Sequence, residues 1–250
     1  MARESVSYTP IVEIRGASVL ITGAGRGIGR ALARSLAAEG ARLTLVARTR
    51  SDLDALAAEV RERGGTALVH AGDIRRPEVC AAAVARAVEA HGGLQVLVNN
   101  AAVATFTKVG ETSDDDWARV IDTNLTAPFR LTRAALPHLS ERGGHVVMIS
   151  SLAGQNAVAG MASYCASKAA LDHFAACLML EVRHQGVKVT TIAPGSVATG
   201  FGGRSEASPQ DAWMLQAEDI AATVLHVLRM RDDAHLSRAE MRPLRPQKRS

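Results

Sequence analysis

The chain has 250 residues, of which 47% are hydrophobic and only 3% are aromatic. This composition excludes a disordered polypeptide, because it supplies enough apolar surface for a large folded core. The formal net charge of +4 is small, and neither a recognition motif nor an aromatic-rich basic segment accompanies it, so we expect no nucleic-acid partner.

Short apolar segments rich in β-branched residues alternate along the chain with longer segments of helical spacing. The predicted strands are 17–22, 42–47, 66–71, 94–99, 145–150 and 187–193, with a further terminal strand at 239–244. The predicted helices are 30–39, 52–63, 77–91, 115–139, 163–185 and 217–230. Segment 195–216 shows no such pattern and contains several glycines, so we expect a mobile substrate loop there.

This alternation of elements predicts an α/β fold. Strands too apolar to face water on either side indicate a parallel sheet, covered by helices on both faces and connected by right-handed crossovers. We predict a single Rossmann-like, doubly wound domain over residues 1–250, with a sheet of about seven strands. Residues 1–14 are expected to form an N-terminal extension and 242–250 a basic tail. We expect the cations near the C-terminus to be solvated, namely Arg238, Arg242, Arg245, Lys248 and Arg249.

Four glycines lie within seven residues of the segment ITGAGRGIG, Ile21–Gly29, which joins the first predicted strand to the first helix. A plain turn rarely needs so many, whereas glycine lets a pyrophosphate approach the backbone at a helix N-terminus. The spacing fits T-G-x-x-x-G-x-G and not G-x-G-x-x-G. We therefore expect a dinucleotide cofactor to contact Gly23, Gly25, Arg26, Gly27, Ile28 and Gly29.

The second predicted strand ends in VARTR, which places Arg48 and Arg50 where an NAD-binding unit usually carries an acid. A carboxylate repels the 2′-phosphate of NADP, whereas a guanidinium binds it in a forked contact. We therefore predict NADP(H) as the cofactor, with Arg48 on the 2′-phosphate and Arg26 near it. The alternative is that these arginines only brace the surface.

Tyr164 and Lys168 are four residues apart in the segment YCASK, and Ser151 lies thirteen residues before Tyr164, just after a predicted strand. Positions i and i+4 share a helix face, so a Lys168 ammonium can stabilise a Tyr164 phenolate and lower the phenol pKa from about 10. The combination predicts a proton-transfer site. Y-x-x-x-K alone is a weak signal.

Three further segments accompany this pattern and the glycine loop: NNA at 99–101, DTNL at 122–125 and APGSVAT at 193–199. With them, the chain resembles the short-chain dehydrogenase/reductase family from residue 17 to residue 199. The resemblance implies hydride transfer between the nicotinamide and a ketone, a 3-oxoacyl group or a hydroxy acid, in either direction. It also implies assembly as a homotetramer or homodimer through two long central helices.

The resemblance assigns a role to each member of a catalytic tetrad. It makes Tyr164 the general acid/base, while Lys168 lowers the pKa of Tyr164 and holds the nicotinamide ribose. Ser151 binds the substrate oxygen. Asn124 completes the implied tetrad by fixing a water that links the lysine to solvent.

The remaining cofactor contacts are likewise implied by the resemblance. They are Asp73 and Ile74 along the adenine, Asn100, Ala101 and Ala102 beside the cofactor, and Pro194, Gly195, Val197 and Thr199 over the nicotinamide. Ala102 stands where the family usually has glycine, so a methyl group must fit there. The C-terminal segment LSRAEMRPLRP also departs from the common ending and resembles the branch that includes serine and 3-hydroxy acid dehydrogenases.

Two other functions stay open at this point. One is a cofactor-binding module without chemistry, although such a module has no use for Tyr164 and Ser151 together. The other is an epimerase or dehydratase, whose substrate domain is usually longer than the segment 200–250.

The three cysteines show no C-x-x-C spacing and the histidines, such as His145 and His173, have no partners at ligand spacing. We therefore expect neither a disulfide framework nor a metal site.

No apolar run reaches membrane-spanning length and the start of the chain lacks a continuous apolar region, so we expect a cytoplasmic protein. The scarce aromatics Phe106, Phe201 and Trp213 either contact an apolar substrate or pack in the core.

Overall fold

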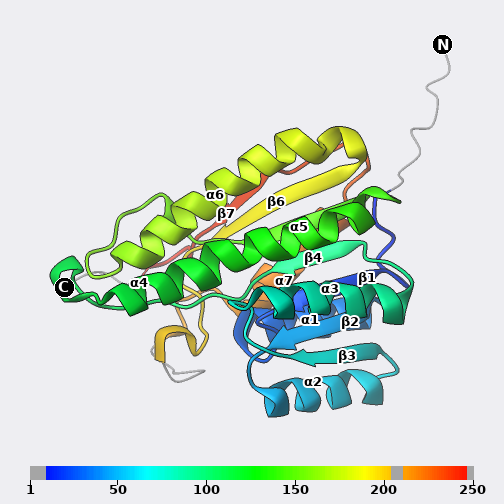
Figure 1. Ribbon diagram of the computed structural model, residues 1–250, viewed down its shortest axis with the longest axis horizontal. Coiled ribbons are helices and arrows are strands. Elements are labelled where there is room, and N and C mark those ends of the chain that lie inside the picture. Colours follow the sequence, from blue (N-terminus) through cyan, green and yellow to red (C-terminus); the bar gives the residue numbers. More distant parts are fainter. Residues whose placement is uncertain (1–9, 204–210, 247–250) are drawn as a thin grey trace.

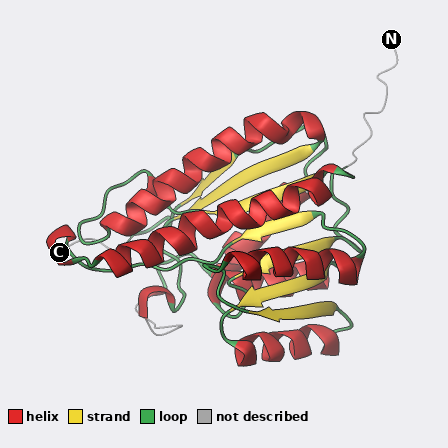
Figure 2. Cartoon of the chain, in the orientation of Figure 1, coloured by secondary structure: helices red, strands yellow, loops and turns green. Residues whose placement is uncertain are grey.

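The computed structural model describes residues 10–203 and 211–246, in which strands and helices alternate in the predicted order (Figure 1; Figure 2). The strands are β1 (Ser18–Thr22), β2 (Arg42–Ala47), β3 (Thr66–Ala71), β4 (Val96–Asn99), β5 (Gly144–Ile149), β6 (Val187–Pro194) and β7 (Arg238–Met241). The longer helices are α1 (Gly27–Ala38), α2 (Arg50–Glu62), α3 (Pro77–His91), α4 (Asp114–Ile121), α5 (Ala127–Ser140), α6 (Ala162–Val182) and α7 (Ala217–Leu228). Residues 1–9 of the predicted extension, 204–210 of the predicted substrate loop and 247–250 of the basic tail lie outside the described residues.

All seven strands are parallel and lie in the order β3-β2-β1-β4-β5-β6-β7. The chain moves outward from β1 to β3, then returns to place β4 on the other side of β1. The loops after β1 and β4 therefore diverge at the carboxyl edge of the sheet and open a crevice between them. The predicted doubly wound α/β fold is confirmed.

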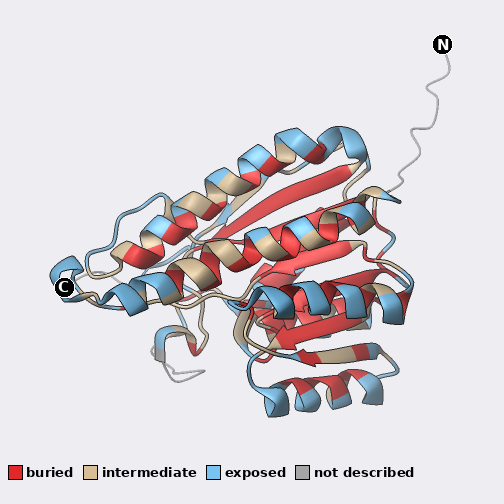
Figure 3. Cartoon of the chain, viewed as in Figure 1, coloured by how far each residue is buried: buried red, intermediate tan, exposed pale blue. Residues whose placement is uncertain are grey.

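Each face of the sheet packs against its own set of helices. Val19 and Val98 belong to the buried cluster that includes α1, α2 and α7, whereas Leu20 and Leu97 belong to the cluster with α3, α5 and α6. Figure 3 shows the central strands buried and the outer faces of the helices exposed. Because successive residues of a strand point to opposite faces, strands covered on both sides must be apolar throughout.

The predicted helix 115–139 contains a break in its hydrogen-bond pattern. Between α4 and α5 the chain forms a π turn, η2 (Asp122–Thr126), so the helical segment stays continuous but gains one residue in a turn. Such turns are rare and occur often at functional sites. The apolar spacing did not predict it, because one extra residue barely disturbs the periodicity of a long helix.

One expectation for the C-terminal cations is wrong. Arg238 is not solvated, because β7 places it beside Asp172 of α6, where Nη1 lies 2.8 Å from Oδ2. Arg242 is more exposed and pairs with Glu240 at 3.1 Å. The strand β7 begins one residue before the predicted segment 239–244 and ends three residues earlier.

Within residues 10–203 and 211–246, none of the helices is both long and apolar enough to cross a membrane. The same residues contain no cluster of three or more His, Cys, Asp or Glu side chains suited to a metal ion.

Candidate active site

A cleft of about 390 Å³ lies along the carboxyl edge of the sheet, lined by residues that follow six of the strands. It brings together most of the predicted site residues, namely Gly23, Gly25, Arg26, Gly27, Ile28, Arg48, Asp73, Ile74, Asn100, Ala101, Ala102, Ser151, Tyr164, Lys168, Pro194, Gly195, Val197 and Thr199. Two predicted residues, Gly29 and Asn124, do not line it.

Three charged residues of the cleft escaped the sequence analysis, namely Asp52, Arg75 and Arg119. Asp52 lies in the first turn of α2 and Arg75 follows Asp73 by two residues. Asp52 and Arg75 each follow the end of a strand by a few residues. This spacing could have predicted their place in the cleft, because residues just after parallel strands lie at the same edge of the sheet. Arg119 lies inside α4 and carries no comparable signal.

The start of α1 faces the cleft with uncapped backbone N–H groups. Arg26 precedes the helix without a side-chain capping bond, and the first turn contains no acid. Gly27 has a φ of +52°, and a Cβ there would lie 3.2 Å from Thr199 Cγ2. The free N–H groups and the helix dipole give this end a positive partial charge that suits a phosphate.

Gly29 packs closely against the chain's own backbone, and its contact with the cofactor stays a prediction. A Cβ on Gly29 would lie 2.2 Å from the carbonyl oxygen of Gly23 and 2.6 Å from Asn100 Nδ2. That amide nitrogen donates to the Thr22 carbonyl oxygen at 2.8 Å, while Thr22 Oγ1 accepts from the N–H groups of Asn100 and Ala101 at 3.0 and 3.1 Å. The residues following β1 and β4 are thus joined directly beneath the cleft.

The two arginines after β2 differ in position, since one lines the cleft and the other does not. Arg48 is exposed and lines the cleft, and its charge contributes to lowering the pKa of Asp73. Arg50 lies outside the cleft lining and pairs with Asp54 at 3.1 Å. Of these two arginines, only Arg48 therefore lies where a ligand in the cleft could contact it.

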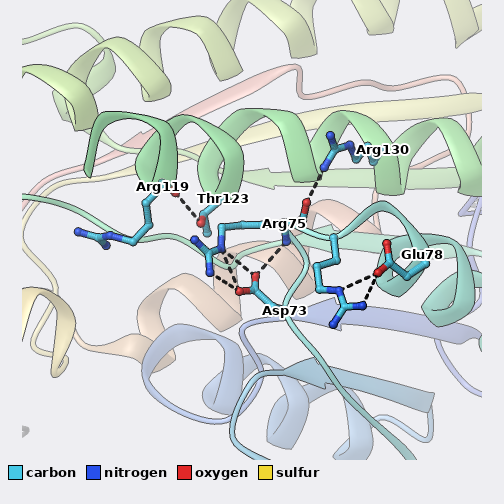
Figure 4. A network of polar contacts seen from close by, with 7 residues as sticks. Asp73, Arg75, Glu78, Arg119, Thr123 and Arg130 are labelled. Carbon is cyan, nitrogen blue, oxygen red and sulfur yellow. Dashed lines mark hydrogen bonds and ion pairs between the residues drawn. The ribbon is translucent and has the colours of Figure 1, made fainter. Parts of the chain in front are cut away.

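A network of arginines surrounds Asp73 at the same end of the cleft (Figure 4). Arg75 donates from Nε and Nη2 to the Asp73 carboxylate at 2.9 and 2.6 Å, and this contact lowers the carboxyl pKa. Arg130 donates from Nη1 to the Arg75 carbonyl oxygen at 2.6 Å and so fixes the backbone of the turn. Asp73 is consequently ionised and its charge is offset by a guanidinium inside the cleft.

Tyr164 enters the other end of the cleft from the first turn of α6 and is only 8% exposed. Burial raises its pKa, and the Ser151 hydroxyl opposes this by hydrogen bonding. We expected Lys168 to lower the pKa of this phenol, but the net direction in the protein is the opposite. The main cause is burial of the phenol. Lys168 Nζ lies 5.8 Å from the ring centroid and donates to the Ile149 carbonyl oxygen at 2.8 Å.

Asn124 lies in the π turn and acts from behind the cleft. Its side chain donates to the Val103 carbonyl oxygen and accepts from the Val103 N–H, both at 2.9 Å. It also donates to Ser167 Oγ at 3.0 Å, and Ser167 in turn donates to the Tyr164 carbonyl oxygen at 2.7 Å. Asn124 therefore fastens the loop after β4 to the turn of α6 that carries Tyr164.

Of the residues Phe106, Phe201, Trp213 and His145, only Phe201 lines the cleft. Phe201, in the short helix η5 (Phe201–Gly203), lines the cleft with its ring centroid 5.6 Å from that of Tyr164, whereas Phe106 and Trp213 do not line it. His145 is buried away from the cleft, where it bonds Thr190 Oγ1, and burial lowers its pKa to about 3.

Comparison with known proteins defines the class. The family model described as short chain dehydrogenase matches residues 17–210. The chain therefore belongs to the short-chain dehydrogenase/reductase family and is an oxidoreductase of that family, whose members act on CH–OH groups.

Individual relatives extend this likeness. The short-chain reductase protein NovJ of Streptomyces niveus is 35% identical over 245 residues, which covers 92% of this chain and 93% of that protein. Glycine betaine reductase ATRR of Emericella nidulans is 31% identical over 250 residues, but the match covers 96% of this chain and only 20% of that protein. A metagenomic short-chain oxidoreductase crystallised with NADP has a TM-score of 0.81 at 36% identity, covering 93% of this chain and 99% of that chain.

The close packing at Gly29 predicts a specific loss of stability. Gly29→Ala should lower the free energy of unfolding by about 2–3 kcal/mol, because a methyl group meets backbone that cannot rotate away. Chemical denaturation measures this loss. Gly110→Ala is the matched control, since a Cβ there meets no atom within 4 Å, and it should change stability by less than about 0.5 kcal/mol. Equal losses in the two variants would contradict this account of Gly29.

Proposed function

We propose that the chain transfers hydride between NADP(H) and a ketone or secondary alcohol, with Tyr164 as the general acid/base. The observation that supports this most is the shared cleft, in which the α1 N-terminus and the Tyr164, Lys168 and Ser151 group line one continuous space. The cofactor supplies the hydride at its nicotinamide ring. Everything else in the reaction is positioning and proton movement by this chain.

Tyr164 and Ser151 act on the same substrate oxygen atom, and Lys168 lies beside the phenol. Burial raises the pKa of Tyr164, so the phenol is protonated at neutral pH and carries the proton that we assign to the carbonyl oxygen. Ser151 donates to the same oxygen and stabilises the negative charge that develops there. Lys168 has a pKa lowered to about 8 by burial and so remains mainly charged at neutral pH beside the phenol.

Cofactor choice follows from the charges at the opposite end. Arg48 and Arg26 line that end and outnumber Asp52, which leaves one net positive charge near the β2 end for a 2′-phosphate. Asp73 does not disturb this balance because Arg75 pairs with it. The NADP complex of the metagenomic relative supports the same choice.

We also propose that the protein forms a homo-oligomer through the outer faces of its long helices. Three large apolar side chains are exposed there, Trp117 on α4, Phe129 on α5 and Leu180 on α6, at 45%, 43% and 56%. Exposed apolar groups on these helices favour burial against a second copy.

The proton-transfer role predicts a separation of binding from turnover. Tyr164→Phe should bind NADPH with unchanged affinity but lose turnover by about 10²–10⁴-fold, because the ring remains and only the proton donor is removed. NADPH oxidation is measured with a panel of ketones and 3-oxoacyl thioesters, and binding by NADPH fluorescence. Equal rates in the variant and the parent protein would reject the role of Tyr164.

The difference between the two arginines after β2 predicts a matched result. Arg48→Asp should weaken NADPH binding by roughly ten- to a hundredfold, as expected for the loss of a charged hydrogen bond, and leave NADH binding almost unchanged. Arg50→Asp introduces the same charge outside the cleft lining and should affect neither cofactor. Titration calorimetry with both nucleotides gives the comparison, and an unaltered preference in the Arg48 variant would remove the basis for NADP(H).

The oligomer proposal predicts that association depends on the helix faces. Leu180→Glu should lower the sedimentation mass, because a carboxylate cannot be buried against a partner without a counter-charge. Leu244→Glu makes the same change at a residue 91% exposed near the C-terminus and should leave the mass unaltered. A parent protein that sediments as a monomer of 26.3 kDa would rule out the assembly.

A further inference from the structure

The Lys168 ammonium lies in an environment that disfavours its charge. The residue is 2% exposed, and Nζ donates one hydrogen bond, to the carbonyl oxygen of Ile149. A neutral acceptor offsets only part of the free energy lost when an ammonium leaves water. A buried negative charge nearby is what such a group requires to stay protonated.

Asp172 supplies a carboxylate one helical turn further along α6, on the same face as Lys168. Its side chain is 14% exposed and lies against the short helix η3 (Leu152–Gly154), which follows Ser151 directly. A Cβ on Gly154 would lie 2.9 Å from Asp172 Oδ2 and 3.0 Å from the carbonyl carbon of Lys168. The carboxylate therefore packs over the turn that carries Lys168, because helical side chains lean toward the N-terminus.

Arg238 holds this carboxylate from a third element. Its Nη1 lies 2.8 Å from Asp172 Oδ2, and its Nε lies 3.4 Å from Glu240 Oε1, so charges of alternating sign run from α6 onto β7. The strand β7 also fixes the cleft itself, since the Gly195 N–H donates to the Met241 carbonyl oxygen at 2.8 Å. The carboxylate is thus immobilised by the same strand that supports the loop beside the predicted nicotinamide site.

We propose that Asp172 is a positioning residue of the active site, whose carboxylate, held by Arg238, keeps the buried ammonium of Lys168 charged. It lies outside the Tyr164, Lys168, Ser151 and Asn124 group. The effect of Asp172 on the charge of Lys168 does not depend on the proposed function. Only the use of that charge in the reaction rests on it.

The charges around α6 agree with this assignment. Burial lowers the pKa of Lys168 to about 8, and the opposing contribution comes from the charge of Asp172. Tyr164 on the same helix is neutral at this pH, and Asn124 on η2 and the Ile149 carbonyl carry no charge. The other titratable groups on α6 and on the elements packed against it are Asp114, Asp115, Asp116, Arg119, Asp122, His145, Cys165, His173, Cys177, Glu181, Arg183, His184 and Lys188.

A direct titration of Lys168 tests the proposal without substrate or cofactor. The chain contains four lysines, Lys108, Lys168, Lys188 and Lys248, so ε-¹³C NMR of lysine-labelled protein gives few signals. Arginine substitutions at the other three assign Lys168 by elimination. In the parent protein its midpoint should lie near pH 8.

The variants separate charge from structure. Asp172→Asn should move the midpoint toward lower pH by about one unit, and Asp172→Glu should restore it, because the negative charge returns. Asp172→Ser repeats the loss of charge if the asparagine variant fails to fold. Glu181→Gln is the matched control, since it removes one exposed negative charge from the same helix and should leave the midpoint in place.

An unmoved midpoint in the neutral Asp172 variants would overturn the proposal, as would an equal shift in the Glu181 control. Because the protein is titrated alone, failure here leaves hydride transfer untested by the same data. Conversely, loss of the proposed oxidoreductase activity in the ketone panel leaves this titration unchanged. The two results therefore fail independently.

Discussion

The close contact between the residues following β1 and β4 is the constraint on which the rest of the site depends. The Gly23 carbonyl lies where a Cβ of Gly29 would have to be, and Asn100 bridges both sides of the crevice with its amide. The crevice of a doubly wound sheet opens at this point, so its floor leaves no room for a side chain at position 29. Only then do the α1 N-terminus and the loop after β4 lie close enough to bind one extended ligand.

Burial on the far side of the cleft sets the protonation states that the chemistry uses. Desolvation raises the pKa of Tyr164 above its ordinary value of 10.0 and lowers that of Lys168 from 10.5 to about 8, so the two pKa values move apart. The proton therefore stays on the phenol oxygen of Tyr164 at neutral pH, where it is available to a carbonyl oxygen. The same packing that stabilises α6 against the sheet therefore keeps the phenol protonated, whereas the charge of Lys168 is assigned to Asp172 as well.

The sequence predicted the fold and most of the cleft because both follow from patterns that survive without three-dimensional information. Apolar runs give the strands, and residues just after strand ends give Gly27, Asp73, Asn100 and Ser151. The pattern assigned Arg48 to the 2′-phosphate, but it did not show that Arg50 pairs instead with Asp54, one turn along α2. It also could not place Asn124 behind the cleft, since the π turn that rotates it is a matter of hydrogen bonding and not of composition.

The direction of the Tyr164 shift shows a more general limit of sequence reasoning. The spacing of Tyr164 and Lys168 on one helix face indicated attraction between them, but it carried no information on how deeply the phenol is buried. In the protein burial of the phenol raises its pKa, while Lys168 Nζ lies 5.8 Å from the ring centroid and donates to the Ile149 carbonyl oxygen. Sequence spacing indicates which charged residues are neighbours on a helix. It does not indicate desolvation, which depends on the elements that pack around the group, here η3, β5 and Phe201. Where the two effects compete at a buried site, the three-dimensional packing decides the sign.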